Sequence, residues 1–492
     1  MKKLVYIGFL FGCLGAGCFP AHAQVAGQGS LITQTDSSQT QYLSLEACVR
    51  EALENNMDIK TSSTQAAIAG VYLNQAKMEQ LPAVSGYIGH GLNSGRSINP
   101  SDNSYISQSF TSADYSLSAS LSLFNGFKIR NYIRKSKLDK QAGELDAQQQ
   151  KDAITIQVIA AYLEVLNQQE ILNNYYQQLL TTQVQYNRLD TLNQSGAANP
   201  DDFYDMKGQL SSGELAITSQ QNVIKSAKIT LFELMNQPLN MNVVLKDPAA
   251  GKDNNAGQQT SIDGIYTKAL SFLPTVKAAD LKYQSAIKNV AVEKADYYPS
   301  LSLNAGIGTA FSSAATRSVT GDLVTAETGD YVMMGADKLP VYSSSNAMSY
   351  RDIPYWNQIK NNYGTNVNLT LNIPIFNKLQ SRTDVKVAAL QAALAKDQLS
   401  TARTALKNAI GKAYFDQQTA QEAWLKQQEL VTAYKEYFRI SEVKFNAGAI
   451  NSADYLIAKN KLSQAEISLV AAKYNYLFKT KILSYYEGTL SL

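Results

Sequence analysis

The residues able to do chemistry in this chain are few, and two aspartates among them recur at a fixed spacing. Asp202 lies six positions after Gly196, and Asp454 lies six positions after Gly448, so the second pair repeats the first. Each carboxylate would fall in the first turn of a helix, where backbone amides are free and the helix dipole is positive. Helix capping accounts for both aspartates, and a functional role stays open as the alternative.

The other reactive side chains do not combine into a site. After Ala23 the chain has one histidine, His90, and one cysteine, Cys48, which together cannot form a Cys/His zinc site. Neither a phosphate-binding loop nor a Gly-x-Ser-x-Gly elbow occurs. We therefore expect no catalytic, cofactor or metal site and no enzyme activity, and we expect His90 to be exposed. A net charge of +3 argues against a nucleic-acid partner.

The N-terminus has the pattern of a targeting segment. Lys2 and Lys3 precede an apolar run over residues 4–19, and small residues at 21 and 23 offer a cleavage site before Gln24. This predicts a secretory signal peptide over residues 1–23, the alternative being a lipoprotein acylated at Cys18. Cys48 would then be the only mature cysteine, which excludes an internal disulfide.

Four stretches alternate apolar and small polar residues, as half-buried strands do. They lie at about residues 83–92, 115–124, 300–308 and 366–376. Their polar positions hold Ser, Asn and Gly, which suits a water-filled lumen better than an outer surface rich in charge. Aromatic residues gather at the strand ends, as in an interfacial girdle: Phe124, Phe127, Tyr297, Tyr298 and Phe376.

An internal repeat organises the chain. The first copy occupies residues 24–237 and the second residues 262–487, with a linker at 238–261 and a tail at 488–492. Before the strands Ser44 matches Ser261, and after them Phe124 matches Phe376, so the offset between the copies grows among the strands. Each copy reads helix, strand, strand, helix, helix, and the extra residues of the second copy fall in a predicted interstrand loop at 309–364.

Each copy also contains a long helix that ends in a tight turn. Residues 127–193 and 378–447 contain no proline, and at 1.5 Å per residue a helix of this length extends about 100 Å. Apolar residues from 154 to 189 step by four and three, which predicts packing against neighbouring helices along one seam. The turns at about 195–202 and 447–454 are predicted helix–turn–helix tips.

The duplicated motifs resemble those of the TolC-like outer-membrane efflux proteins. LSLEACVREALENN is similar to the family's opening helix, LPAVSGYIG and YPSLSLNAG to its strand starts, SLFNGFKIR to its strand-to-helix junction, and FNAGAINSADYLIAKNKL to its hairpin tip. The resemblance implies a mixed α and β membrane protein. Three chains, with four strands each, would form a 12-stranded outer-membrane β-barrel continuous with a long periplasmic α-helical barrel.

The resemblance also implies a function and partners. It implies a passive exit channel of a tripartite efflux or type I secretion system, in the outer membrane of a Gram-negative-type cell. The channel would be a homotrimer in contact with outer-membrane lipid, a periplasmic adaptor and an inner-membrane pump. Without the resemblance, two other classes stay open: a secreted coiled-coil surface or adhesion scaffold without a pore, and an autonomous porin.

Individual residues can be carried over at the tips. The family's acidic residue six places after the tip glycine lies near the periplasmic mouth, which implies an aperture role for Asp202 and Asp454, with Asp205 nearby. Some members close the mouth with an arginine two places after that glycine, but here the position holds Ala198 or Ile450. We expect the adaptor to dock on the small tip residues: Ser195, Gly196, Ala197, Ala198, Ala447, Gly448, Ala449 and Ile450.

Overall fold

A computed structural model describes residues 42–98, 103, 105–107, 109–197, 199–247 and 261–490. Several predictions fall outside these described residues. They are the signal peptide at 1–23, the alternative acylation at Cys18, the tip residue Ala198, most of the linker and the last two residues of the tail.

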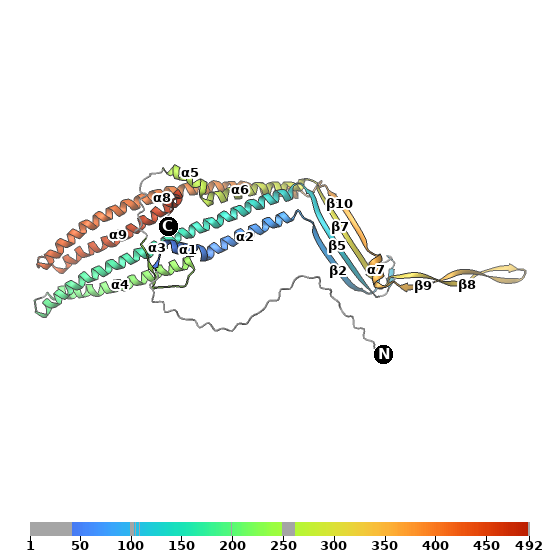
Figure 1. The fold of residues 1–492 in the computed structure, drawn as a ribbon, viewed down its shortest axis with the longest axis horizontal. Helices are drawn as coiled ribbons and strands as arrows, with labels where there is room; N and C mark the ends of the chain where they lie inside the picture. The colour runs from blue at the N-terminus through green and yellow to red at the C-terminus, as the bar shows by residue number, and fades with distance from the viewer. Residues whose placement is uncertain are drawn as a thin grey trace, which may run out of the picture.

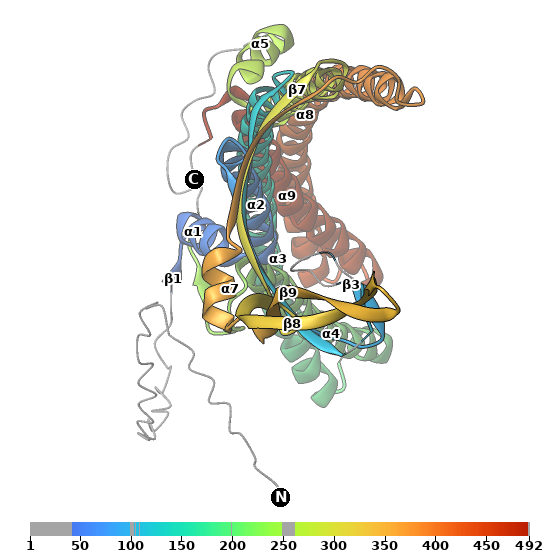
Figure 2. The same cartoon turned by 90° about the vertical axis from the view of Figure 1, so that its right-hand side faces the viewer.

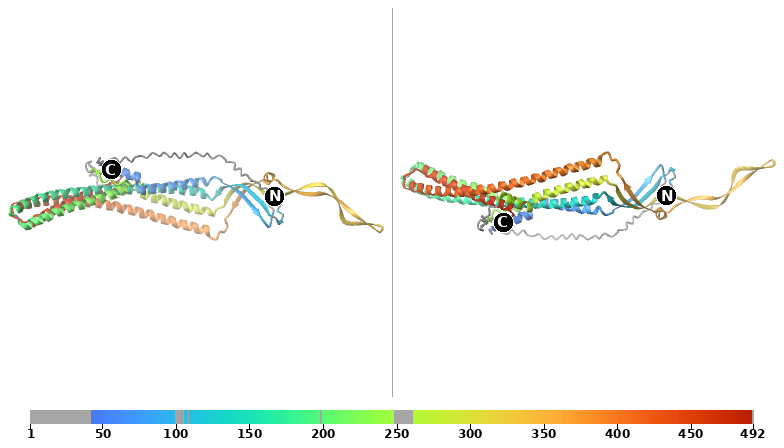
Figure 3. Two further views of the ribbon diagram at one scale, coloured as in Figure 1. Left: turned by 90° about the horizontal axis from the view of Figure 1, so that it is seen from below. Right: turned by 90° about the horizontal axis from the view of Figure 1, so that it is seen from above.

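Two long helical hairpins form one end of an elongated molecule, and a β-sheet lies beyond their other end (Figures 1 and 3). The first hairpin joins α3 (Lys128–Gln194) to α4 (Pro200–Met235), and the second joins α8 (Gln380–Asn446) to α9 (Ser452–Glu487). The longer helices have 67 residues each and the shorter ones 36 each. Each helix of the second hairpin has the same length as its counterpart in the first and begins the same number of residues further along the chain. This is expected for a duplication.

Shorter helices precede the strands in each repeat and also match in pairs. α1 (Leu45–Asn55) matches α5 (Ile262–Phe272), α2 (Met57–Met78) matches α6 (Pro274–Glu293), and the 3₁₀ helix Lys294–Tyr297 follows α6. Ser44 caps α1 by accepting from the Ala47 amide at 3.2 Å, and Ser261 caps α5 by accepting from the Gly264 amide at 3.2 Å. The two serines are the pair matched in the sequence, and they cap equivalent opening helices.

The largest core lies where α1, α3, α4 and α9 meet. The parallel strand pair β1 (Tyr42–Leu43) and β6 (Val244–Leu245) packs against this core. Buried Tyr162 donates to the Leu43 and Lys246 carbonyls at 3.0 and 2.6 Å. Cys48 is fully buried in this core, and burial raises the pKa of its thiol to about 11. It is a packing residue rather than a reactive one.

The predicted helical seam is real but only partly apolar at its tip end. Ile154, Val158 and Val165 are buried in the core, and none of the predicted seam positions from 154 to 189 is exposed. Towards the tip the seam becomes polar, because Thr182 and Gln185 are also buried. Among the described helices, none is both long and apolar enough to cross a bilayer.

The four predicted strands form one antiparallel sheet in the order β10-β7-β5-β2, which is curved when viewed along the molecule (Figure 2). Their bounds are Ala83–Asn93 for β2, Phe110–Asn125 for β5, Ser300–Ser312 for β7 and Gly364–Asn372 for β10. The fourth strand is shorter than the predicted 366–376, since Pro374 has no amide to donate to a ladder. β2 and β10 each leave one edge unpaired within the described chain.

The strand register places the apolar residues on one face and the small polar residues on the other. Leu369 pairs with Leu303, which pairs with Leu121, and one position along Ser120 pairs with Asn304. The Ser120 hydroxyl donates to Asn304 at 2.9 Å, and the Ser85 and Ser118 hydroxyls are 2.8 Å apart. The polar face therefore has its own hydrogen bonds, while Leu117, Ile307 and Leu369 on the apolar face are exposed in the single chain.

The predicted loop at 309–364 is wrong, because most of it is regular structure. β7 continues to Ser312, and a long hairpin of β8 (Thr316–Met334) and β9 (Asp337–Asp352) projects beyond the sheet, followed by α7 (Tyr355–Asn361) (Figure 1). Both hairpin strands are almost wholly exposed, so no buried face marks them in the sequence. A smaller hairpin of β3 (Arg96–Ile98) and β4 (Tyr105–Ser107) lies in the first interstrand segment.

Candidate functional site at the helical tips

The two tips have the same backbone geometry. Gly196 and Gly448 adopt left-handed conformations with φ of +74° and +73° just after the ends of α3 and α8. The Ala197 amide donates back to the Leu192 carbonyl at 2.9 Å, and the Ala449 amide donates to the Lys444 carbonyl at 2.8 Å. This is a glycine-terminated helix end that satisfies the last carbonyls, and it requires glycine only at the left-handed position.

The helices that follow are capped by asparagine. Asn199 accepts from the Asp201 amide at 3.3 Å with Pro200 at the first helical position, and Asn451 accepts from the Asp454 amide at 2.9 Å. Since an asparagine already caps each helix, the aspartates in the first turns are not needed as the primary caps of their own helices.

Asp202 reaches across to the other tip. Its Oδ1 atom accepts a hydrogen bond at 3.2 Å from the backbone amide of Ser452, the first residue of α9. The amide is one of the free donors at the start of that helix, where the dipole also favours negative charge. Asp202 therefore links the tip of the first repeat to the tip of the second, and capping of its own helix is not its role.

The other two aspartates behave differently. Asp454 and Asp205 are exposed, and within the described ranges neither forms a salt bridge. Asp454 lies two residues after Ser452 and is therefore close to the Asp202 link. Asp205 lies one turn further along α4. Among the described residues, the carboxylate of Asp202 is therefore the one of the three that makes a cross-tip hydrogen bond.

A second link between the tips involves Arg188, which the sequence analysis missed. Its guanidinium donates to the backbone carbonyl of Asn446 at 2.8 Å and also to the side-chain oxygen of Asn446. The link joins the last turns of α3 and α8. Arg188 is the only arginine between Arg134 and Arg317, and its counterpart in the second repeat is Ile440, so its isolation was a signal in the sequence.

A shared apolar core holds the tips together. We call it the tip core, and it consists of Leu189, Phe203, Met206, Phe445, Tyr455 and Leu456. Tyr455 is fully buried and stacks on Phe445 with ring centroids 4.7 Å apart. Its hydroxyl has no hydrogen-bond partner, and burial, followed by the charge of Glu442, raises the pKa of Tyr455. The four helices of one chain therefore meet as one unit at this end.

One half-buried lysine lies beside the tip core. The Lys459 ammonium on α9 donates to the Thr182 hydroxyl on α3, and burial lowers the pKa of Lys459. Gln178 and Gln185, on the same face of α3, each carry a buried polar atom without a partner. This polar seam joins the two hairpins above their tips, at a cost in desolvation.

The small residues of the tips point outward. Ser195, Gly196, Ala197, Ala447, Gly448 and Ala449 are exposed. Ile450 is different, because it is half-buried and packs against the tip core. The exposed small residues at each tip are therefore those of the turn itself. A Cβ atom built on either glycine would meet no atom within 4 Å.

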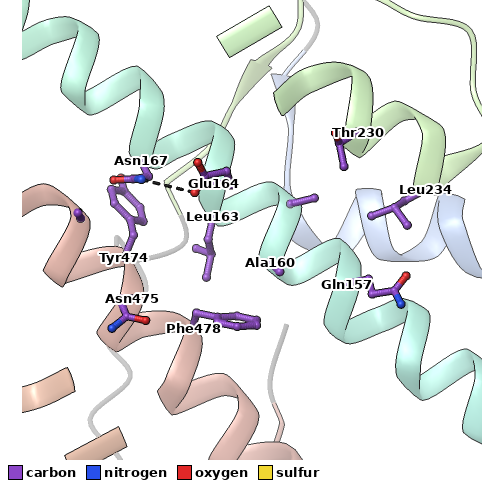
Figure 4. A pocket seen from close by; sticks show the side chains of 12 residues that line it. Gln157, Ala160, Leu163, Glu164, Asn167, Thr230, Leu234, Tyr474, Asn475 and Phe478 are labelled. Carbon is purple, nitrogen blue, oxygen red and sulfur yellow. Dashed lines mark hydrogen bonds between the residues drawn. The ribbon is translucent and has the colours of Figure 1, made fainter. Parts of the chain in front are cut away.

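A groove lies away from the tips, among α3, α4 and α9 (Figure 4). It has a volume of about 580 Å³, and Glu164 is the only acidic residue that lines it. Asn167 donates to Glu164 at 3.5 Å, and burial raises the pKa of neighbouring Tyr474. The groove thus lacks a pair of groups poised for acid–base exchange near neutral pH. Across the described ranges, no three His, Cys, Asp or Glu side chains are placed to hold a metal ion.

Comparisons with known proteins explain this arrangement. The sequence model described as "Outer membrane efflux protein" matches residues 48–237 and 265–483, which is most of both repeats. The chain belongs to the outer membrane efflux protein family. It is an outer-membrane efflux channel that extends into the periplasm, and members of the family are channels rather than enzymes. Neither the coiled-coil scaffold nor the autonomous porin fits this assignment.

Individual relatives are distant in sequence but align with most of this chain. The chain is 20% identical over 440 residues to the toluene efflux pump outer membrane protein TtgC and to the antibiotic efflux pump outer membrane protein ArpC, both of Pseudomonas putida. Each alignment covers 88% of this chain and 80% of the relative.

Two solved structures show the same fold. The Campylobacter jejuni CmeC channel is 18% identical with a TM-score of 0.71, covering 91% of this chain and 86% of CmeC. The open Neisseria gonorrhoeae MtrE channel is 15% identical with a TM-score of 0.70, covering 91% of this chain and 89% of MtrE.

Proposed function

We propose that three copies of this chain assemble into the passive exit duct of a tripartite export system. The observation that carries the proposal is the open four-stranded sheet, whose outer strands β2 and β10 each leave one edge unpaired. Inside a bilayer an unpaired edge is costly, so the strands of neighbouring chains must complete the ladder. Four strands are too few for a membrane barrel, and three chains would supply twelve.

The long helices would continue this barrel as a tunnel through the periplasm. α3 and α8 run from the sheet to the tips, and at 1.5 Å per residue 67 residues span about 100 Å. The polar strand face would line the lumen, while the apolar face would contact outer-membrane lipid. Solute would leave without a binding site of its own, and its selection would rest with the inner-membrane pump.

The tips would form the periplasmic mouth and the docking site of the adaptor. They lie at the end of the molecule farthest from the sheet (Figure 1), and their exposed residues are small, so another helical hairpin can approach closely. Asp202, Asp205 and Asp454 would lie around the mouth. No arginine follows the tip glycines, so the mouth would be held shut by the Asp202–Ser452 link, the Arg188–Asn446 link and the tip core.

The docking proposal is tested at Ala197 and Ala449, since only the neighbouring glycines must be small for the turn. The double variant Ala197→Glu/Ala449→Glu should assemble normally, because exposed substitutions usually change stability by less than about 0.5 kcal/mol. It should lose chemical crosslinking to the adaptor and efflux from cells. The matched control is Ser212→Glu/Gln464→Glu, which adds carboxylates at exposed repeat-related positions on α4 and α9, the helices that follow the two tips.

Two results would count against this proposal. Normal export by the tip variant would show that the tips are only turns. A stable folded monomer in detergent, measured by light scattering, would contradict both the barrel and the tunnel.

A further inference from the structure

The helix α7 occupies an unexpected position on the sheet. β10 pairs with β7 over Gly364–Asn372, and Gly364 lies opposite Gly308. The residues of β7 after Gly308 therefore extend beyond their partner strand. α7 lies beside this extension and takes over its hydrogen bonding. The Thr309 hydroxyl donates to the Ile359 carbonyl at 2.9 Å, and the side-chain Nδ2 of Asn362, the residue after α7, donates to the Ala310 carbonyl at 2.8 Å.

Gln358 completes the replacement. Its side-chain oxygen accepts from the Ser312 amide at 2.9 Å, and its nitrogen donates to the Ser312 carbonyl at 2.9 Å. The same nitrogen donates to the Ile353 carbonyl at 2.8 Å, and the side chain is 2% exposed. A buried amide that pairs like a backbone unit fixes α7 rigidly against the sheet.

The aromatic residues of α7 lie on the apolar face of the sheet. Tyr355 packs on Phe311 with centroids 4.8 Å apart, and its hydroxyl lies 2.8 Å from that of Tyr115. Tyr115 and Phe311 project from the same face as Leu303 and Leu121, which is the face proposed to contact lipid. Figure 2 shows α7 on the same side of the sheet as α1. Beyond Tyr355, the Trp356 ring is 76% exposed.

The height of α7 matches the outer limit of a membrane. From Leu301 to Thr309 there are eight steps along β7. At about 3.3 Å per residue and a tilt of about 40°, these steps rise about 20 Å. The aromatic residues Tyr298 and Phe311 lie just outside this span. An apolar span of about 20 Å, close to the ~25 Å apolar height of outer-membrane barrels, therefore lies between two aromatic levels.

We propose that α7 is an interfacial helix that seats Trp356 at the outer leaflet, between the acyl chains and the headgroups of the outer membrane. Tryptophan favours this boundary because its ring is apolar and its N–H group is polar. The only charged residue of the helix is the exposed Lys360, a cation suited to headgroup phosphates. The inference rests on the proposed membrane position of the sheet, and it places the β8–β9 hairpin wholly outside the membrane.

Tryptophan fluorescence tests the proposal directly. The chain has two tryptophans, and the other, Trp424, stacks on Tyr476 in the helical part. The Trp424→Phe variant therefore reports on Trp356 alone. In phosphatidylcholine vesicles its emission should be blue-shifted, strongly quenched by lipids brominated near the headgroup, less by lipids brominated near the chain end, and little by aqueous iodide.

The controls separate this inference from the proposed function. The Trp356→Phe variant, which keeps Trp424, should not respond to brominated lipid. A further variant carries Leu121→Trp and lacks both native tryptophans, and its emission should be quenched most by lipids brominated deep in the chains. If this variant fails to assemble, Leu369→Trp on β10 takes its place. Quenching of Trp356 by iodide alone, or mainly by deep bromines, overturns the interfacial helix. Loss of lipid quenching at the strand position as well would overturn the membrane placement of the sheet itself.

Discussion

The Asp202 link makes a quantitative prediction about the resting mouth of the channel. Asp202→Ala removes the acceptor of the Ser452 amide, a hydrogen bond of 3.2 Å at a helix start. Loss of such a cap costs about 1 kcal/mol, with a range of roughly 0.5–2. If the cap exists only in the closed mouth, the open state gains about fivefold in relative population for each chain.

The effect multiplies if the three chains open together. Three lost caps amount to about 3 kcal/mol, so the open-to-closed ratio should rise by up to about 150-fold. Single-channel recording in planar bilayers measures this ratio as the open probability. Asp202→Asn should have a smaller effect, since an amide oxygen still accepts a hydrogen bond but carries no charge.

Asp205→Ala is the matched control, because it removes the same carboxylate from an exposed site three residues further along α4. It alters the charge near the mouth without removing the cross-tip hydrogen bond. If both alanine variants raised the open probability equally, charge near the mouth would account for the effect. The reasoning from the Asp202 link would then be refuted.

Three further predictions concern stability and reactivity. Gly126→Ala should destabilise the trimer by about 1–3 kcal/mol, measured as a lower melting temperature. The reason is that φ is +64° and a Cβ would lie 2.6 Å from the Ala295 carbonyl oxygen. The control Lys378→Ala, at the repeat-related position, should leave the melting temperature unchanged. Cys48 should resist iodoacetamide at pH 8 until the protein unfolds, since a pKa of about 11 instead of 9.0 leaves about a hundredfold less thiolate; rapid labelling of the folded trimer would contradict its burial. Burial lowers the pKa of Lys459 below 10.5, so in the pH window just below 10.5 the unfolded chain holds a proton on this lysine that the folded chain has lost. The stability of the folded protein should therefore rise with pH through this window. Thermal melts of Lys459→Met should lack this rise.

The features that follow local rules could be predicted from the sequence. Alternation over nine or ten residues located the four strands and their apolar side, because a period of two follows from strand geometry alone. Helix lengths followed from the absence of proline, and the tip turns followed from Gly196 and Gly448. Duplication strengthened each prediction by providing a second instance.

The contacts between the tips could not be predicted in the same way. The Asp202 carboxylate meets an amide 250 residues later, and Arg188 meets Asn446, 258 residues later. Such pairs depend on how two hairpins pack side by side, and no local pattern encodes this. The repeat symmetry predicted equal roles for Asp202 and Asp454, but among the described residues only Asp202 makes the cross-tip bond.

The insertion between β7 and β10 was missed for another reason. A hairpin exposed on both faces has no hydrophobic period, so β8 and β9 looked like a loop rich in small residues. The turn itself was a usable signal, since Gly335 has a φ of +68° between two extended segments, and a glycine in a two-residue connection is typical of hairpins. The role of Gln358 required the structure, since nothing local distinguishes a buried glutamine from an exposed one.

The two strands of the β8–β9 hairpin are paired at its base, which makes the hairpin a suitable site for inserting a foreign domain. Thr316 and Asp352 are paired partners, and the Ile353 amide donates to the Ala315 carbonyl at 2.9 Å, so the inserted segment leaves and rejoins the sheet at adjacent points. A foreign domain whose own ends lie close together can therefore replace residues 317–351 without displacing β7 or β10. In the proposed membrane orientation, the chain would then serve as a display scaffold that carries epitopes or reporters on the cell exterior while the proposed duct continues to work.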